Sequence, residues 1–476
     1  MPIIDIREVD KTTSGVIATG SDTVLVPGCR FIDMRVYDAN GDPTSQLRTD
    51  YEPKIEYLLF NTVSEFEEKI GKAPLQAAED ITASFEWEDG DDTIGTFLTV
   101  LSENAYDPGY IMAKELLQAG LSVLYVAIPA KGDINGKASI PENIYNTLIT
   151  EFGTSEDVEG LADKGTYDIK YVTSGGYPSV VWDDQHEIMH TDLAAKMLSF
   201  ASNVRNDCLA LIDYNSEEDV FVTKGTGTEA TKVSIVDECG FDNSYGAMFA
   251  PWATYDRRTT DLYEAYNNLG AEDDAGELIK STSIFTAPAS YAYLLALAES
   301  IKTNPNWLAI AGATRGSVPM IKKPLKPISN TLANKLQPEK SGRSMNAITN
   351  INPYGNCIWG NRTLSNMKEG LVATDSLHIR NMVNDIKKVC YTSARACMFE
   401  QDTDVLWINF KSRITPLLDR MKSGYGISGY RIVRDMDRVE ATQNATICAK
   451  VIIFPTFAVE NFYITVVLEN GEVTVE

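Results

Sequence analysis

The chain has 476 residues, 44% of them apolar and 23% charged, which excludes a disordered polymer and allows about two to four folded domains. Lys and Arg number 42 against 67 Asp and Glu, and the net charge of −25 excludes nucleic acid or an anionic membrane surface as the main partner. The first residues lack the apolar core of a signal peptide, and no window is apolar enough for a membrane span, so we expect a soluble chain made in the cytosol. Seven cysteines without a Cys-x-x-Cys pair indicate reduced thiols and not disulfides or a zinc ribbon.

The first 20 residues predict an extended N-terminal arm. Ile4 and Ile6 alternate with charged residues, and a polar joint follows at residues 11–15. Such alternation is typical of a short strand, and the joint is typical of a flexible connection. A terminal strand of this kind needs a pairing partner from elsewhere.

Residues 21–340 predict an α/β domain with a helix-covered mixed sheet that is largely parallel. Residues 106–119 have a helical pattern that ends at Gly120, and a buried strand follows at 121–128. The other expected strands are 168–173, 207–214 and 245–252, and the other expected helices are 183–204 and 288–301. This alternation favours parallel strands joined by helical crossovers. Residues 321–340, rich in Pro and Lys, are the best linker candidate.

Residues 341–476 predict a smaller α+β domain. The expected elements are helices at 376–400 and 404–423 and strands at 430–433, 446–454 and 462–468. Pro416 lies inside the second helix and should kink or divide it.

The chain end predicts a second arm, at about residues 457–476. Its alternating apolar residues are Phe462, Ile464, Val466 and Leu468. Asn470 and Gly471 are typical of a tight turn after this strand. The strand can pair within its own domain, or it can add to the sheet of a neighbouring subunit. The pattern alone leaves both alternatives open.

The negative charge is concentrated in the first domain. Residues 341–476 hold 15 basic and 14 acidic side chains, a net of +1, so residues 1–340 carry 27 − 53 = −26. In the helix 376–400, a helical projection separates an apolar side from a cationic side. The cations of that side are Arg380, Lys387, Lys388 and Arg395. They form either a solvated helix face or a docking surface for an acidic partner.

The strongest catalytic pattern is HExxH at residues 186–190. His186 and His190 lie one turn apart on the expected helix and can bind zinc while Glu187 activates water. Glu217 or Glu218 lies at a workable distance for a third ligand, but both follow a strand in an expected loop. In the alternative interpretation, the two histidines simply flank the core. A zinc metallopeptidase is thus the alternative function.

Other catalytic or cofactor motifs are absent from the sequence. It contains no phosphate-binding P-loop and no Gly-x-Ser-x-Gly elbow, and its three histidines leave few options for nucleophilic catalysis. Residues 224–228 lack the glycines of a dinucleotide fingerprint. We therefore expect no cofactor and no enzyme activity.

Several stretches in order resemble contractile tail sheath proteins, the subunits of the outer cylinder of contractile bacteriophage tails and related injection machines. They are residues 65–71, 113–128 with QAGLSVLYVAI, 168–179 with DIKYVTSGGYPS, 246–252 with GAMFAPW, 351–364 with INPYGNCIWGNRTL, and 404–435 with VLWINF and SGYGISGYRIV. The resemblance covers most of the chain after residue 60, whereas residues 21–105 match weakly.

The resemblance implies a structural subunit that polymerises as stacked hexameric rings around an inner tail tube protein and contracts to drive the tube through a target envelope. It implies an outward-facing α/β domain, a tube-facing C-terminal domain, and arms that connect neighbouring subunits. The implied arm residues are Ile4, Ile6, Phe462, Ile464, Val466 and Leu468, and the implied tube-facing residues are Arg380, Lys387, Lys388 and Arg395.

The resemblance also implies the partners and the location of the protein. Baseplate and tail terminator proteins are expected partners, and the subunit itself is expected to bind neither nucleic acid nor membrane. Its expected location is the tail of a virion assembled in the host cytoplasm. A filament or shell protein that shares only this assembly logic is a further alternative.

Overall fold

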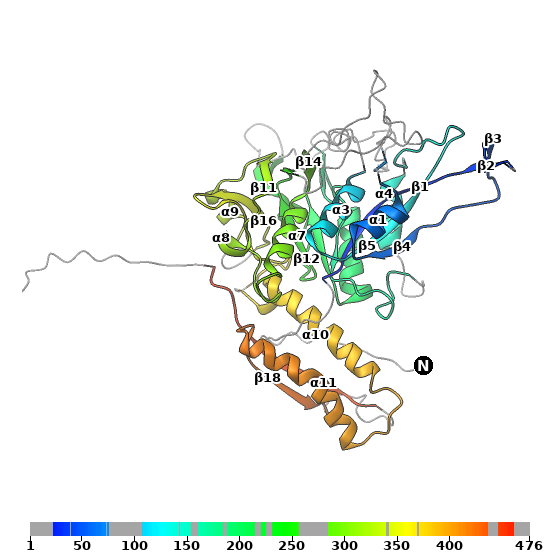
Figure 1. Cartoon of the computed structure of the whole chain (residues 1–476). Helices are drawn as coiled ribbons and strands as arrows, with labels where there is room; N and C mark the ends of the chain where they lie inside the picture. The colour runs from blue at the N-terminus through cyan, green and yellow to red at the C-terminus, as the bar shows by residue number, and fades with distance from the viewer. Residues whose placement is uncertain are drawn as a thin grey trace, which may run out of the picture.

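The computed structural model shows a large α/β domain and a small C-terminal domain beside it (Figure 1). The described residues are 22–38, 40–72, 74–75, 107–141, 143–153, 160–183, 188–214, 220–224, 231–256, 284–338, 342–368, 371–436 and 446–460. The predicted arm residues Ile4, Ile6, Phe462, Ile464, Val466 and Leu468 lie outside these ranges.

An eight-stranded mixed sheet forms the centre of the α/β domain. Its strands in spatial order are β17 (Gly355–Trp359), β16 (Asn346–Ile351), β12 (Gly246–Ala250), β9 (Leu209–Asp213), β6 (Tyr171–Val172), β1 (Val24–Ile32), β5 (Val123–Lys131) and β4 (Glu56–Phe60). The inner strands are parallel, and the edge strands β17 and β4 are antiparallel to their neighbours. The fold class predicted from the sequence is confirmed.

Helices cover both faces of the sheet, because strands that are parallel and central bury both of their sides. The helices on one face are α1 (Val63–Ile70), α3 (Pro108–Ala119) and α7 (Ala289–Ser300), and those on the other are α4 (Ile144–Phe152) and α5 (Asp192–Ser199). Strand residues alternate between these layers: Val24 and Val26 pack with the first group, and Leu25 packs with the second.

The local sequence explains where α3 begins and ends. The Asp107 side chain accepts a hydrogen bond from the Gly109 N–H, and Pro108 occupies the first helical turn, where its missing N–H is harmless. Gly120 ends the helix with a φ of 98°, a left-handed conformation that glycine adopts without strain. The helix predicted at 106–119 is thereby confirmed, with its stop at Gly120.

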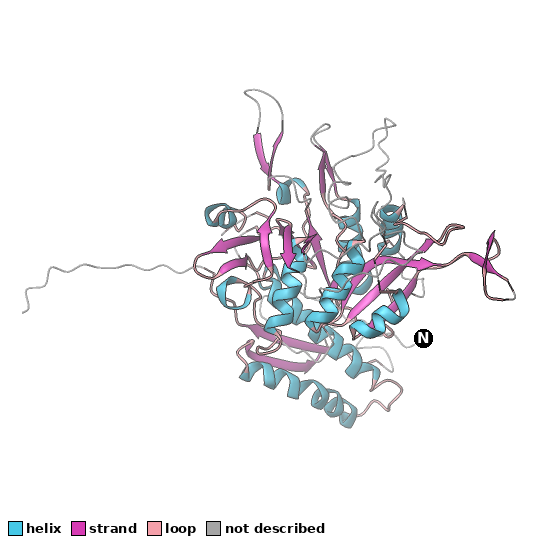
Figure 2. Cartoon of the chain, turned by 45° about the horizontal axis from the view of Figure 1, so that its top comes forward, coloured by secondary structure: helices cyan, strands magenta, loops and turns pink. Residues whose placement is uncertain are grey.

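Shorter elements extend from the α/β domain. Three pairs of strands form small sheets: β2 (Arg35–Tyr37) with β3 (Pro43–Leu47), β7 (Val181–Asp183) with β8 (Ile188–His190), and β10 (Phe221–Lys224) with β11 (Thr231–Ser234). A three-stranded sheet contains β13 (Ala253–Asp256), β14 (Ile284–Ala287) and β15 (Ile321–Pro324). The remaining helices are the π-helix η1 (Phe200–Arg205), α6 (Ile235–Glu238), α8 (Gly312–Arg315), α9 (Asn330–Lys335) and the 3-10 helix η3 (Ala373–Asp375). The β2–β3 hairpin projects to the side of the molecule (Figures 1 and 2).

The C-terminal domain packs two helices against one hairpin. Its elements are α10 (Leu377–Arg395), α11 (Asp404–Ser423), β18 (Ile427–Arg434) and β19 (Ala449–Pro455). Ile379 and Met382 of α10 meet Ile414 and Leu418 of α11 in a separate apolar core, to which Ile432 of β18 contributes. This core is small, so the domain also depends on its contact with the larger one.

The structure corrects the predicted domain boundary at residue 341. β16 and β17 lie beyond that residue, but they belong to the sheet of the α/β domain. The C-terminal domain therefore begins near Leu377, with α10. The predicted linker at 321–340 is also wrong, because it contains β15 and α9.

Two helix predictions need correction as well. The helix expected at 183–204 is replaced at its start by the strands β7 and β8, and α5 begins only at Asp192. Pro416 does not divide α11, which runs unbroken from Asp404 to Ser423.

No helix of the described ranges combines the length and the apolar character that crossing a membrane requires.

Candidate functional site

The contact between the two domains is formed by α10 and the segments that lead into three parallel strands. Asp385 of α10 binds Lys170, the residue before β6, and Asn384 donates to the carbonyl of Cys208, the residue before β9. Arg380 lies over the ring of Tyr245, the residue before β12. The helix thus crosses the amino ends of the inner strands, below the sheet in Figure 1.

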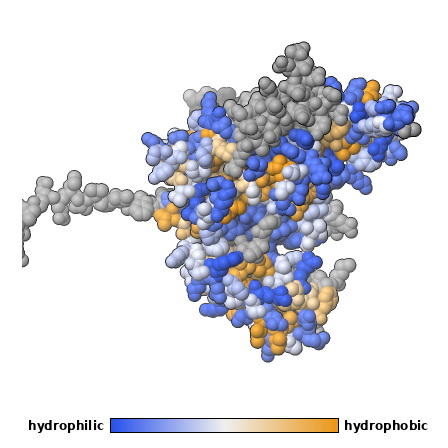
Figure 3. Space-filling model, viewed as in Figure 1, coloured by the Kyte–Doolittle hydropathy of each residue, from blue (hydrophilic) through white to orange (hydrophobic). Residues whose placement is uncertain are grey.

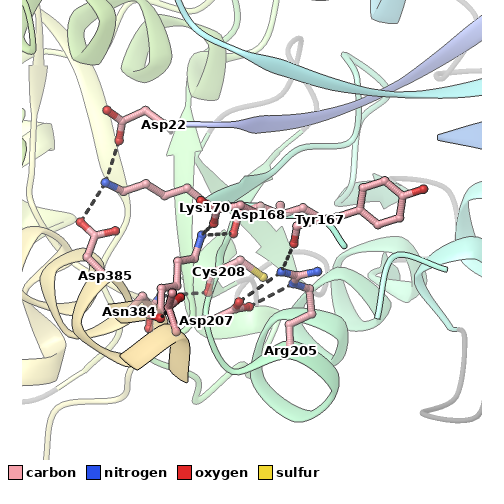
Figure 4. A network of polar contacts seen from close by, with 12 residues as sticks. Asp22, Tyr167, Asp168, Lys170, Arg205, Asp207, Cys208, Asn384 and Asp385 are labelled. Atoms are coloured by element: carbon pink, nitrogen blue, oxygen red, sulfur yellow. Dashed lines mark hydrogen bonds and ion pairs between the residues drawn. The ribbon is translucent and has the colours of Figure 1, made fainter. Parts of the chain in front are cut away.

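Lys170 is the central charge of this contact. Its ammonium lies 2.7 Å from a carboxylate oxygen of Asp22 and 3.0 Å from one of Asp385, and its side chain is 2% exposed (Figure 4). Burial by itself lowers the pKa of Lys170, but the charges of Asp385 and Asp22 outweigh burial and hold the pKa above its ordinary value. Lys170, which stays protonated and lies directly before β6, therefore connects Asp22 near the N-terminus with Asp385 of α10.

A second group of charges flanks Lys170 along the same edge. Lys388 of α10 forms an ion pair with Asp168 and donates to the Ile169 carbonyl at 2.7 Å. Buried Arg205 binds both carboxylate oxygens of Asp207, at 3.0 and 3.1 Å. It also donates to the carbonyls of residues 161 and 167. The bonds of Arg205 hold the loop before β6, and Lys388 of α10 contacts residues of the same loop.

The four cations predicted to face an inner tube all lie toward the α/β domain instead. Arg380 and Lys387 are buried against Tyr245, and Lys388 is held by Asp168. Arg395 is exposed, but its guanidinium lies against the backbone of Gly165, where an added Cβ would be 2.6 Å from Nη1. The expected exposed cationic face of α10 is therefore wrong for Arg380 and Lys387, which the larger domain covers, whereas Arg395 remains exposed.

An apolar anchor completes the domain contact on another side. Trp307 follows α7 in the α/β domain, yet its indole belongs to the core of the C-terminal domain with Ile414 and Leu418. Its Nε1 donates to the carbonyl of Gly424 at 3.1 Å. The two domains are therefore joined by both polar and apolar contacts.

The segment after β19 returns to the α/β domain beside the start of α10. His378 is buried, its Nδ1 lies 2.7 Å from the amide nitrogen of Asn361, and its ring bonds to the backbone of Thr456. Burial lowers the pKa of His378 to about 4, so the ring is neutral at physiological pH. Glu460, four residues after Thr456, forms an ion pair with buried Arg362 at 2.5 Å.

An exposed apolar area of the C-terminal domain lies at the turn between α10 and α11 and at the start of α11. Ile408 of α11 is 62% exposed, and Val405 and Phe399 are also exposed. Figure 3 shows this apolar area at the lower tip of the domain. Ile408 and Pro416 border a shallow groove of about 370 Å³ along the outer side of α11, with Lys411 at its rim. This surface is available to a partner.

The β18–β19 hairpin offers strand edges for pairing. The two strands are antiparallel over residues 427–434 and 449–455, and in the described part of the chain they form a sheet of only two strands. Strand edges present unpaired N–H and C=O groups that can bind a further strand.

The HExxH pattern does not lie on the single helix that the expected metal site requires. His190 lies on strand β8, paired with Val181 of β7, so a helix cannot place it one turn from His186. His186, Glu187, Glu217 and Glu218 lie outside the described residues. Within those residues no cluster of three His, Cys, Asp or Glu side chains could hold a metal.

Two buried carboxyl groups at the opposite end of the sheet have structural roles. Asp107 caps α3, and burial raises its pKa to about 6. Asp213, at the end of β9, accepts hydrogen bonds from the N–H and the hydroxyl of Ser290 at the start of α7, and burial raises its pKa to about 7. Both groups bind donors at helix starts, which accounts for their burial.

Sequence patterns missed the residues that matter most for the domain contact. A lysine between Ile169 and Tyr171 in a buried strand is a signal for an acidic partner, but nothing local identifies Asp385, 215 positions away. Trp307 lies in an irregular segment without periodicity. Gly424 and Gly426 indicate a turn and do not reveal that an indole lies on them.

No protein-family model matches the sequence, and no curated protein matches it in a sequence comparison. Solved structures do match over nearly the whole chain. A chain of the PVC sheath complex of an extracellular contractile injection system in its contracted state has a TM-score of 0.52 at 13% identity, with 99% of this chain and 98% of that chain covered.

Two structures of the anti-feeding prophage baseplate match as well. A chain of the 6-fold symmetrised baseplate has a TM-score of 0.51 at 11% identity, and one of the contracted baseplate has 0.50 at 15% identity; each match covers 98% of this chain and 99% of the other. The protein therefore has the fold found in sheath complexes of contractile injection systems. The resemblance noted in the sequence is confirmed at the level of the fold.

Proposed function

We propose that this protein is the subunit of a contractile sheath. In this function it polymerises as stacked hexameric rings around an inner tube and contracts to drive the tube through a target envelope. The agreement of its fold with a chain of the PVC sheath complex, over 98–99% of both chains, carries the proposal. Baseplate and terminator proteins at the two ends of the sheath are further proposed partners, and the tail of a phage or phage-like particle is the proposed location.

We propose that the terminal arms link neighbouring subunits by strand addition to the β18–β19 hairpin. The hairpin has the edges that such pairing needs, and the alternating Ile4 and Ile6, with the set from Phe462 to Leu468, have the matching pattern. Each backbone hydrogen bond contributes about 0.5–1.5 kcal/mol net, so several bonds can keep an arm paired while the domains move. The burial of the α10 cations does not affect this part of the proposal.

The tube contact is proposed for the outer face of α11. Three of the cations first considered for it, Arg380, Lys387 and Lys388, contact the α/β domain. Ile408 and Val405 are exposed on the opposite helix, and Lys411 and Arg413 lie beside them. An apolar stripe with basic residues suits a partner that offers apolar side chains and acidic groups.

Electron microscopy and sedimentation of the purified full-length chain test the sheath function. We expect hollow cylinders with sixfold symmetry as the concentration rises. A variant without residues 1–20 is the matched control, and it should remain folded by circular dichroism but form no long cylinders. A full-length chain that stays monomeric at every concentration contradicts the sheath function, whereas normal cylinders from the truncated chain contradict only the arm assignment.

A further inference from the structure

Both terminal segments join the described fold at an acidic residue that a buried cation of the α/β domain binds. On the N-terminal side this residue is Asp22, the first that the structure describes, and its partner is Lys170. On the C-terminal side it is Glu460, the last described before the chain end, and its partner is Arg362, whose side chain is 7% exposed. We call these two ion pairs the root latches.

The N-terminal latch adds a carboxylate that charge balance does not require. Lys170 and Asp385 form a pair that connects the two domains and by itself neutralises the buried ammonium. Asp22 binds the same ammonium and is the more exposed of the two carboxylates, at 15% against 5%. Removal of Asp22 therefore leaves a balanced pair, whereas removal of Asp385 separates the domains from their shared cation. The bond to Asp22 therefore acts mainly on the N-terminal segment, which joins the described fold at Asp22.

In the C-terminal latch, Glu460 is the only carboxylate among the described residues that pairs with the buried cation, whereas Lys170 has two carboxylate partners. Arg362 donates from one terminal nitrogen to Glu460 and from the other to the sulfur of Met367, and its Nε has no acceptor among the described residues. Asn361 also donates to the Glu460 carboxylate. The carboxylate thus supplies the negative charge for a guanidinium that water hardly reaches, and this holds residue 460 against the loop after β17.

Both latches converge on α10. Lys170 of the first binds Asp385 of that helix. Asn361, which also donates to Glu460 of the second, binds the ring of His378. These two helix positions are seven residues apart, about 10 Å along the axis. The roots of segments that are far apart in sequence are thus fixed to one helix, which is also the helix that joins the domains.

We propose that Asp22 and Glu460 fix the roots of the terminal segments to the domain contact of their own subunit, so that a pull on either segment acts on α10. Without these bonds a pull would first peel residues from β1 or from the β18–β19 hairpin. The statement about a pull rests on the proposed sheath function. The fixation of the roots does not, and it can be tested on the unassembled protein.

Hydrogen–deuterium exchange of the soluble full-length chain tests the fixation. The Lys170 and Tyr171 amides donate to the Thr23 carbonyl, and the Val24 amide donates to the Ser122 carbonyl, so these amides report on the N-terminal root. Asp22→Asn should accelerate their exchange by about tenfold or more. Glu460→Gln should do the same for amides of residues 449–460, because Gln keeps the shape and loses only the charge.

Two variants serve as matched controls. Glu56→Gln removes the ion pair with Arg30, near the other end of β1, and Asp402→Asn removes the pair with Arg434 from the C-terminal domain. Neither residue lies at a root, so neither control should accelerate exchange there. Equal acceleration by a control, or none in Asp22→Asn and Glu460→Gln, overturns the proposal.

Thermal unfolding separates a latch from a general support of the fold. Asp22→Asn should change the unfolding midpoint much less than Asp385→Asn, and equal shifts would overturn the role assigned to Asp22. The sheath function is tested by a different result. A wild-type chain that never polymerises contradicts the sheath function but does not change the conclusion from the exchange experiment. If cylinders form, those of the doubly substituted Asp22→Asn and Glu460→Gln chain should break at lower denaturant concentration than those of wild type.

Discussion

The indole of Trp307 lies against Gly424 and donates its N–H to that residue's carbonyl oxygen at 3.1 Å. A Cβ added at Gly424 would be 2.6 Å from the ring, and one at Gly426 would be 2.7 Å from it. Gly424 has a φ of −90°, which any residue adopts. Close approach of the indole therefore explains the glycine at 424, and the turn that follows α11 is one of the places where the two domains meet.

Gly424→Ala should weaken the domain contact by about 1–3 kcal/mol, because the new methyl group displaces the indole. The free energy of unfolding in urea measures this change. In a Trp307→Ala background the same substitution should change that free energy far less. An unchanged effect in this background would show that the methyl group acts on something other than the indole.

The sequence predicted the elements of this fold better than it predicted their surroundings. Periodicity located α3, β5, α10 and α11, because apolar spacing and caps such as Gly120 are local signals. It misplaced the domain boundary, since strand pairing of β16 with β12 is a long-range property. It also expected the polar side of α10 to be a solvated face or a docking surface for a partner. A projection of Arg380 and Lys387 shows their side of the helix but cannot show that Tyr245 covers it.

Asp213 should make the protein less stable as the pH rises. Its pKa is raised from 3.8 to about 7 in the folded state, so between these values the folded state binds a proton that the unfolded state has released. Stability from this group is thus present below pH 4 and is lost as the pH rises to 7, by at most about 4 kcal/mol. Asp213→Asn should remove this loss. The check is the free energy of unfolding of both proteins at pH 4 to 7.5, and parallel curves would contradict the prediction.

His378 should act in the opposite direction over much of the same range. Burial lowers its pKa from 6.5 to about 4, so between these values the unfolded state binds a proton that the folded state excludes. Stability is therefore lost as the pH falls from 6.5 toward 4, by at most about 3 kcal/mol. His378→Gln should flatten this acid limb in urea titrations at pH 4 to 7. Since Asp213 has the reverse slope, only the single variants separate the two contributions.

Ile408→Asp should abolish binding to the inner tube without unfolding the subunit. Ile408 is 62% exposed on α11, so a polar replacement there should change the unfolding free energy by no more than about 0.5 kcal/mol. It would, however, place a charge in the apolar centre of the proposed tube contact, where an unpaired charge is strongly unfavourable. Cosedimentation of the subunit with preassembled tubes measures the effect. Tyr425→Asp is the control, because Tyr425 is even more exposed but lies at the other end of α11. Equal losses in both variants would mean that the tube does not bind specifically at the Ile408 groove.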